Sequence, residues 1–172
     1  MIRSGFRLLL FVAICFTVVP PGLAPAQTAV LAGLAGTWKL DLAKSKIPKV
    51  LKTQSQMMVV KPSASNVAFD FVTDGVPGRH RNYILDGNEH LYGQNGAIPN
   101  LYRSYYTAEV KPGVLAVHYR TRLETSASPT VGATEGNRST ERWEISPDGR
   151  TLTRTFVSGE PDFDGTCVYD KQ

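Results

Sequence analysis

The chain has 172 residues, with 19 Lys and Arg against 15 Asp and Glu and a formal net charge of +4 at pH 7. Two of the basic residues, Arg3 and Arg7, lie in a segment that we expect to be removed. That leaves 17 basic against 15 acidic residues and a net charge of +2. A charge this close to neutral gives no basic face of the kind that nucleic-acid-binding proteins carry, so nucleic acid is not an expected partner.

The N-terminus has the three parts of a secretory signal peptide. Arg3 and Arg7 precede the apolar run 8–19, which ends at Pro20, and small residues follow at 24–26. The run is shorter than the roughly 20 residues of a membrane-spanning helix. We therefore predict a signal peptide over residues 1–26, cleaved near Ala26, and a secreted or periplasmic protein with no stable membrane insertion.

Residues 27–172 are expected to form one domain, because about 146 residues suit a single hydrophobic core. Cys15 leaves with the signal peptide, and Cys167 is then the only cysteine, so no disulfide can form within the chain. The stability of the domain must come from its core.

Period-2 alternation recurs in short segments bounded by Gly, Pro, Asn and Asp, which is typical of antiparallel β structure. In the clearest example, Val67, Phe69 and Phe71 share one face of a strand. The expected strands cover residues 36–40, 54–61, 66–73, 80–85, 90–92, 101–110, 114–124, a segment with Trp143 and Ile145, 151–157 and 166–170.

Most of these strands are joined by short turns, so sequence neighbours should pair, and closure would remove the exposed edges. We predict an all-β fold, an antiparallel up-and-down β-barrel of about 8–10 strands. Residues 93–100 and 125–137 are expected to be loops, and 41–52 a lysine-rich loop with one helical turn, forming a solvated lid over one barrel end.

The segment Gly36-Thr37-Trp38-Lys39-Leu40 resembles the Gly-x-Trp opening strand of the calycins, the superfamily of lipocalins and fatty-acid-binding proteins. The ending Val168-Tyr169-Asp170-Lys171 is similar to the last strand of fatty-acid-binding proteins. The chain also resembles a set of small secreted bacterial proteins of uncharacterised activity, through residues 36–40, 44–46, 148–153 and 168–172. These resemblances imply a lipocalin-like β-barrel domain.

The resemblance also implies roles for individual residues. In calycins the opening Trp lies across the closed barrel end beneath an Arg from a late strand, which would make Trp38 and Arg154 a cation–π pair. Fatty-acid-binding proteins place an Arg two residues before the final Tyr to hold the ligand carboxylate. Here Cys167 precedes Tyr169 instead, so another cation must hold any carboxylate.

Aromatic residues with a few hydroxyl groups suit a small-molecule pocket, although they suit a packed core equally well. The predicted ligand-binding residues are Phe69, Phe71, Tyr83, Tyr102, Tyr106 and Tyr169.

Metal and catalytic patterns are weak in this sequence. His80, His90 and His118 lie on separate segments without paired spacing. The acidic segment 160–164 lacks the calcium-loop pattern, and Cys167 fits a small core residue better than a nucleophile. We expect no metal, no cofactor and no catalytic residue.

Three functions fit these features. The favoured one is an exported binding protein that holds a small apolar, hydrophobic molecule in its barrel. The second is an envelope protein, such as an inhibitor, that binds a protein partner through loops 93–100 and 125–137. The third and weakest is a barrel isomerase or cyclase that uses His118 or Tyr106.

Overall fold

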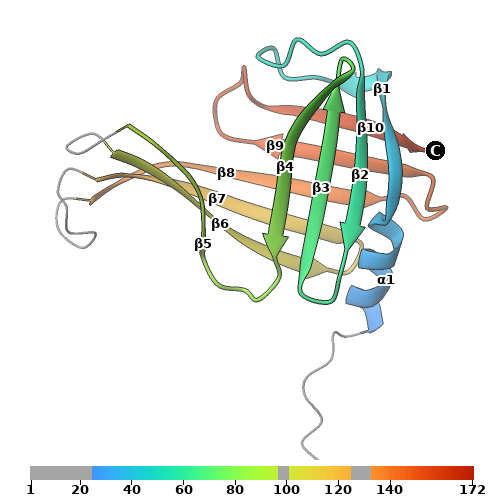
Figure 1. The fold of residues 1–172 in the computed structure, drawn as a ribbon, viewed down its shortest axis with the longest axis horizontal. Coiled ribbons are helices and arrows are strands. Elements are labelled where there is room, and N and C mark those ends of the chain that lie inside the picture. The colour runs from blue at the N-terminus through green and yellow to red at the C-terminus, as the bar shows by residue number, and fades with distance from the viewer. Residues whose placement is uncertain (1–24, 97–100, 125–132) are drawn as a thin grey trace, which may run out of the picture.

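The structure is a computed structural model that describes residues 25–96, 101–124 and 133–172. Within these residues one helix precedes ten strands (Figure 1). The elements are α1 (Pro25–Leu34), β1 (Gly36–Lys46), β2 (Gln56–Pro62), β3 (Asn66–Thr73), β4 (Val76–Ile84), β5 (His90–Asn95), β6 (Leu101–Lys111), β7 (Val114–Glu124), β8 (Ala133–Ile145), β9 (Thr151–Val157) and β10 (Gly165–Lys171).

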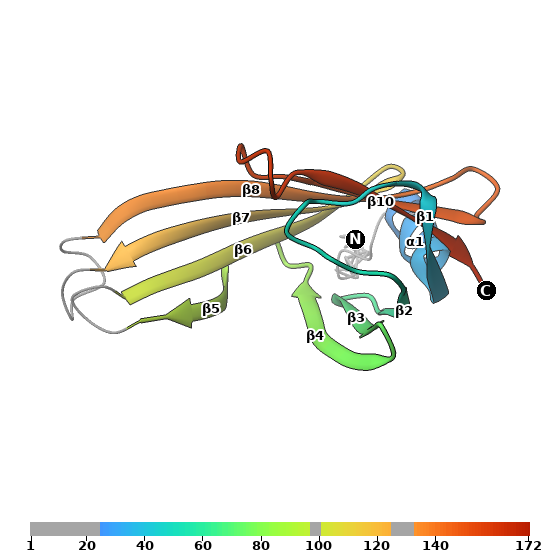
Figure 2. The ribbon, with the colours of Figure 1, turned by 90° about the horizontal axis from the view of Figure 1, so that it is seen from above.

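The strands form one antiparallel sheet in the order β4-β3-β2-β1-β10-β9-β8-β7-β6-β5. The sheet curls so that β2, β3 and β4 face the layer of β6, β7 and β8 (Figure 2). This confirms the predicted all-β, up-and-down barrel fold. Among the described residues, however, no strand pairing closes the ring, because β4 and β5 are the two ends of the sheet order.

A tyrosine side chain bridges part of the seam between the two ends of the sheet. The hydroxyl of Tyr106 on β6 accepts a hydrogen bond from the backbone N–H of Ile84 (3.1 Å) and donates one to the carbonyl of Asn82 (3.2 Å). The side chain therefore satisfies backbone groups of β4 that a neighbouring strand would otherwise pair with.

The core lies inside the curled sheet. On β3 the buried positions are Val67, Phe69 and Phe71, as the alternation predicted. Trp38, Trp143, Tyr83 and Tyr169 are among the largest fully buried side chains. Each large apolar side chain buried in this way contributes roughly 1.5–3 kcal/mol.

The helix α1 packs against one end of the barrel, beside the start of β1 (Figure 1). Its residues Val30, Leu31 and Leu34 are buried in the core, and the carbonyl of Leu34 accepts a hydrogen bond from Nε1 of Trp38 (2.9 Å). The sequence did not predict this helix. The expected cleavage site near Ala26 lies in its first turn, and residues 1–24 lie outside the described part.

The predicted pairing of Trp38 with Arg154 is wrong. The cation over the Trp38 ring is Lys171 (5.1 Å to the centroid), whereas Arg154 lies over Trp143 (5.4 Å). The register explains both pairs, because Lys171 is the cross-strand partner of Trp38 and Arg154 that of Trp143.

Three of the predicted loops are partly strand. β1 continues to Lys46, across a register shift after Asp41, and Ser45 Oγ accepts a hydrogen bond from the Val168 N–H (2.8 Å). β8 begins at 133 and β5 ends at 95, so residues 133–137 and 93–95 are extended. The remaining residues of the two proposed contact loops, 97–100 and 125–132, lie outside the described residues. Gly96, which precedes the first of these two ranges, forms a bend.

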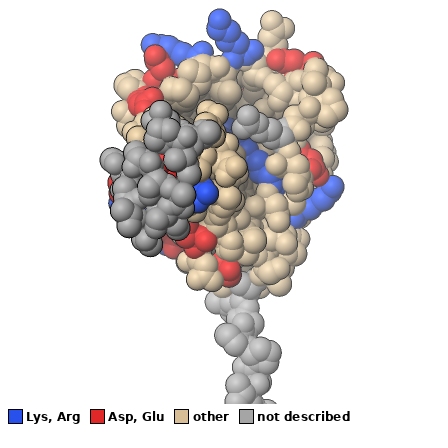
Figure 3. Space-filling model, turned by 60° about the vertical axis from the view of Figure 1, so that its left-hand side comes forward, with Lys and Arg blue, Asp and Glu red and all other residues tan. Residues whose placement is uncertain are grey.

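Two further findings concern surfaces. In the part of the chain that the structure describes, no helix has the length and apolar character needed to cross a bilayer. The face shown in Figure 3 carries Lys and Arg interspersed with Asp and Glu.

Candidate functional site: a cavity with a buried charge cluster

The barrel contains a cavity of about 530 Å³, within the usual range of small-molecule pockets. One part of its wall is apolar and comes from β3, β9 and the two segments that follow β1 and β9. These apolar residues are Pro48, Val50, Leu51, Phe71, Phe156 and Phe163.

The segment between β1 and β2 is held over the cavity by the β3–β4 turn. The carboxylate of Asp74 accepts hydrogen bonds from the backbone N–H groups of Gln54 (3.0 Å) and Ser55 (2.6 Å). Asp74 and Gly75 have positive φ angles of 50° and 80°, which suits a tight hairpin turn. The turn thereby places Val50 and Leu51 at the cavity, where each remains about half exposed.

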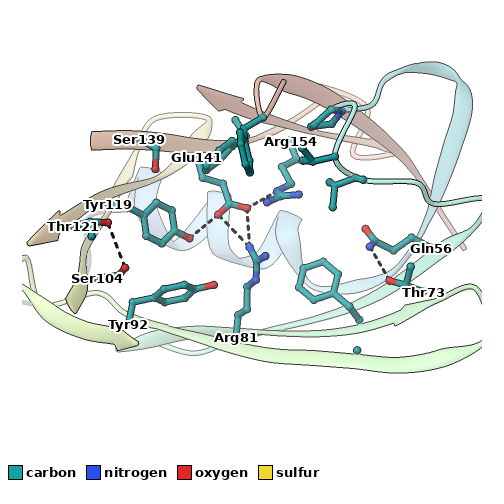
Figure 4. Close-up of a pocket in the computed structure, with 17 residues that line it drawn as sticks. Gln56, Thr73, Arg81, Tyr92, Ser104, Tyr119, Thr121, Ser139, Glu141 and Arg154 are labelled. Atoms are coloured by element: carbon teal, nitrogen blue, oxygen red, sulfur yellow. Dashed lines mark hydrogen bonds and ion pairs between the residues drawn. The ribbon is translucent and has the colours of Figure 1, made fainter. Parts of the chain in front are cut away.

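A buried ionic cluster lies at the centre of the cavity (Figure 4). Glu141 on β8 is fully buried, and both of its carboxylate oxygens lie 3.3 Å from Nη1 of Arg81 on β4. Nε of Arg154 on β9 and the hydroxyl of Tyr119 on β7 (2.6 Å) also donate to this carboxylate. Four strands thus meet at one carboxylate.

Two tyrosines extend the cluster. The hydroxyls of Tyr83 and Tyr119 lie 2.6 Å apart, and the Tyr83 hydroxyl also lies 3.3 Å from Glu141. Burial, together with the neighbouring carboxylate, raises the pKa of both tyrosines well above the ordinary value of 10.0. Both tyrosines are therefore neutral hydrogen-bonding groups at physiological pH.

Glu141 stays ionised despite its burial. Burial raises the pKa of its carboxyl, but the charges of Arg154 and Arg81 and the Tyr119 hydrogen bond act in the opposite direction and prevail. The pKa of Glu141 consequently lies below its ordinary value of 4.5.

The cluster has more positive than negative charge. Among the described residues that line the cavity, two guanidinium groups face one carboxylate, and the tyrosines are neutral. In addition, the buried Nε of Arg81 has no hydrogen-bond partner within the described chain. The cavity can therefore accept one further negative charge.

The structure separates the predicted ligand-binding residues into three groups. Phe71 lines the cavity. Phe69, Tyr83, Tyr106 and Tyr169 are buried around it: Phe69 stacks on Trp143 (4.7 Å between centroids), and the Tyr169 hydroxyl donates to Oε1 of Gln56, a lining residue (2.7 Å).

Tyr102 is the exception, because its side chain is 48% exposed and is not part of the cavity wall. It lies where β6 extends with β5, β7 and β8 beyond the layer of β2–β4 (Figure 1). The structure therefore corrects its expected place in the interior. A binding role for the other five residues stays a prediction.

Sequence reasoning missed Arg81, Tyr119 and Glu141 as site residues. The available signal was a charged residue on the inward-facing side of a strand. Arg81 lies two residues before Tyr83, and Glu141 lies two residues before Trp143, so the two side chains of each pair point to the same face. Arg154, which the resemblance placed over an indole, shares the face of the buried Leu152, and its side chain is 12% exposed and lines the cavity.

The groups considered for metal binding or catalysis lie apart. His80, His90 and His118 each contact a different carboxylate: Asp70 (2.6 Å), Asp86 (2.8 Å) and Glu109 (3.2 Å) respectively. Asp162 pairs with Lys49 (3.1 Å), and Asp164 accepts hydrogen bonds from Ser158. Within the described residues, no three His, Cys, Asp or Glu side chains gather in a metal-binding group.

Searches against family models and against curated proteins found no match. Solved structures do match. A REP1-NXSQ fatty acid transporter has a TM-score of 0.54 at 11% identity, with 82% of this chain and 97% of that one covered. A Schistosoma mansoni fatty acid binding protein in complex with arachidonic acid has a TM-score of 0.54 at 11% identity, covering 83% and 98% of the two chains.

A secretory abundant heat soluble protein from Ramazzottius varieornatus gives a TM-score of 0.52 at 12% identity, with 81% and 96% coverage. At such low identity these similarities establish the fold alone. The chain has the calycin-like fold of the fatty-acid-binding and lipocalin-like barrels.

Proposed function

We propose that the protein is an exported binding protein that holds a small amphipathic molecule with one negative charge inside its barrel. The observation that carries this proposal is the excess of one positive charge in an otherwise largely apolar cavity. A buried guanidinium without a counter-charge is unfavourable, and Arg is well suited to carboxylate or phosphate groups. A bound anion would offset the extra charge.

The position of Arg154 supports an anion-binding role. Cys167 stands where the resemblance to fatty-acid-binding proteins places a cation, and Arg154 is its cross-strand partner in the β9–β10 ladder. A guanidinium thus reaches the same region of the barrel from the neighbouring strand. The hydrocarbon part of the ligand would cover Val50, Leu51 and Phe163, which are 47%, 46% and 46% exposed.

The matched transporter and binding protein are named for fatty acids, which agrees with an acidic ligand that carries a hydrocarbon chain. Export rests on the signal peptide predicted over residues 1–26 and on the resemblance to small secreted bacterial proteins.

A displacement titration with a fluorescent fatty-acid probe tests the proposal. Hexadecanoate should displace the probe about tenfold more strongly than hexadecanol, since each 1.4 kcal/mol of added interaction is a factor of ten. Arg81→Gln leaves Glu141 paired with Arg154 alone, so this variant should lose most of the preference for the acid. Arg142→Gln, at an exposed position on the same strand as Glu141, should keep it. Absence of saturable probe binding, or equal displacement by both compounds, would contradict the proposal.

A further inference from the structure

Hydroxyl groups line the cavity on one side of the ionic cluster. They come from four adjacent strands: Tyr92 on β5, Ser104 on β6, Thr121 on β7 and Ser139 on β8. Ser104 and Thr121 are cross-strand partners, and Ser139 is the partner of Tyr119. β7 and β8 thus carry both hydroxyl groups and members of the ionic cluster.

These hydroxyls have unused hydrogen-bonding capacity. Ser104 and Thr121 share one long contact of 3.4 Å between their oxygens. Within the described part of the chain, neither the Tyr92 hydroxyl nor the Ser139 hydroxyl has a hydrogen-bond partner, although both residues line the cavity. Tyr92 is 38% exposed and Ser139 is partly exposed, so water can reach both hydroxyls, and polar atoms of a bound molecule would replace that water.

The three kinds of wall have a spatial order. In Figure 4, Ser104, Thr121 and Ser139 lie to one side of Glu141 and Arg81, and Gln56 and Thr73 lie to the other. The apolar Phe71 belongs to the Gln56 side, because it lies two residues before Thr73, the cross-strand partner of Gln56. Val50 and Leu51 lie in the segment that leads into Gln56, and Phe156 is level with the cluster as the cross-strand partner of Glu141. The cavity is therefore apolar, then ionic, then hydroxylated.

We infer that the ligand is a single-chain lipid whose head group is a phosphodiester followed by a hydroxylated alcohol. This inference rests on the proposed function and specifies the ligand. A carboxylate ends a chain, and nothing would extend from it to the hydroxyl side. A phosphodiester carries one negative charge and is substituted on both sides, so the acyl chain lies against the apolar wall while the alcohol reaches Tyr92 and Ser139. Guanidinium groups bind its oxygens in a planar, two-pronged geometry.

Two lysolipids with the same acyl chain, titrated as monomers into the protein by calorimetry, test the inference. Lysophosphatidylglycerol has the diester charge and two hydroxyls on its head-group glycerol, whereas lysophosphatidylmethanol has the same charge and no head-group hydroxyl. We expect the glycerol lipid to bind about tenfold more tightly, because a few net hydrogen bonds amount to that factor.

The variant that isolates the hydroxyl side is Tyr92→Phe with Ser139→Ala, which removes two oxygen atoms and leaves the ionic cluster intact. It should bind both lysolipids within about twofold of each other, and its unchanged affinity for the methanol lipid will show that the cavity is preserved. Ser65→Ala, at an exposed turn position between β2 and β3, should keep the full preference.

Equal binding of the two lipids by the unmodified protein overturns the inference, and so does a preference that survives in the double variant. Tight binding of hexadecanoate alongside equal binding of the lysolipids would overturn the inference while leaving the proposed function standing. Failure of hexadecanoate and both lysolipids to bind would overturn the two together.

Discussion

The negative charge of the Glu141 carboxylate affects the stability of the barrel. Its carboxylate is fully buried and is the only salt-bridge partner of Arg81 and of Arg154 among residues 25–96, 101–124 and 133–172. A buried ion pair contributes little net stability compared with an apolar substitute, but the loss of one partner leaves a charge without compensation. Replacement of Glu141 by a neutral residue therefore leaves Arg81 and Arg154 without their salt-bridge partner.

The substitution Glu141→Gln keeps the shape of the side chain and removes its charge. Two buried guanidinium groups would then lack a counter-charge, so the free energy of unfolding should fall by about 3–5 kcal/mol. Urea denaturation followed by tryptophan fluorescence measures the change. The control Glu144→Gln lies on the same strand in an exposed pair with Arg142 (2.7 Å) and should cost less than about 1 kcal/mol. A similar small loss in both variants would show that the cluster is not a stabilising unit.

Acid should weaken the protein through the same carboxyl. The pKa of Glu141 is lowered in the folded state, so its contribution to stability is fully present above the ordinary pKa of 4.5. That contribution is lost as the pH falls below 4.5 towards the lowered pKa. Unfolding free energies measured between pH 6 and pH 3 should therefore decline more steeply for the unmodified protein than for Glu141→Gln. Parallel curves for the two proteins would be inconsistent with an ionised Glu141.

At the scale of elements, α1 stabilises the barrel end at which β1 begins. Leu34 is fully buried, and its carbonyl fixes the indole of Trp38. Leu34→Ala should lower the free energy of unfolding by about 2–5 kcal/mol, the usual cost of truncating a buried Leu. Leu42→Ala, at a position that is 45% exposed on β1, is the matched control and should have a much smaller effect. If the two variants proved equally stable, α1 would not be part of the folded core.

The seam between β4 and β5 should open locally when its tyrosine bridge is removed. Tyr106→Phe deletes the hydroxyl that binds the N–H of Ile84 and the carbonyl of Asn82. We expect faster hydrogen exchange at the Ile84 amide, by about fivefold, since one hydrogen bond is worth about 1 kcal/mol. Amides in the β1–β10 ladder, remote from the seam, should be unaffected. Unchanged exchange at Ile84 would mean that the bridge does not protect this edge.

The strands that could be predicted are those with one face in the core. Alternation located β3 because Val67, Phe69 and Phe71 are buried there. The first residues of β8 had no such signal: Glu135, Gly136 and Asn137 are exposed, so the segment has the polar, glycine-containing composition of a loop. Pairing with β7 makes it a strand, and that is tertiary information.

The candidate site was less predictable than the fold for a related reason. The alternation of side chains along each strand could have predicted that Arg81 and Glu141 point into the barrel. It could not have predicted that they meet, because these residues are 60 positions apart and lie on β4 and β8. They meet only because the sheet curls until its two halves face each other (Figure 2). Arg154 could be placed inward from its own strand, yet its partner depended on the β8–β9 register.

At the scale of the whole molecule, the curled sheet and the charged cavity inside it together form a binding compartment. A curled ten-stranded sheet surrounds a cavity of about 530 Å³, and α1 packs at the end where β1 begins. The described residues that line the cavity include one more cation than anion. These features fit a carrier of an amphipathic anion, in which the barrel shields the hydrocarbon chain from water while the arginines bind the acidic group.

The measurement that tests this account most directly is native mass spectrometry of the protein purified from its native source. The account predicts a stoichiometric adduct that disappears on denaturation and that, once released, has a hydrocarbon chain and a single acidic group. The adduct should be depleted in Arg81→Gln and retained in the surface variant Arg142→Gln. A clean mass of the protein alone, or an adduct without an acidic group, would contradict the account.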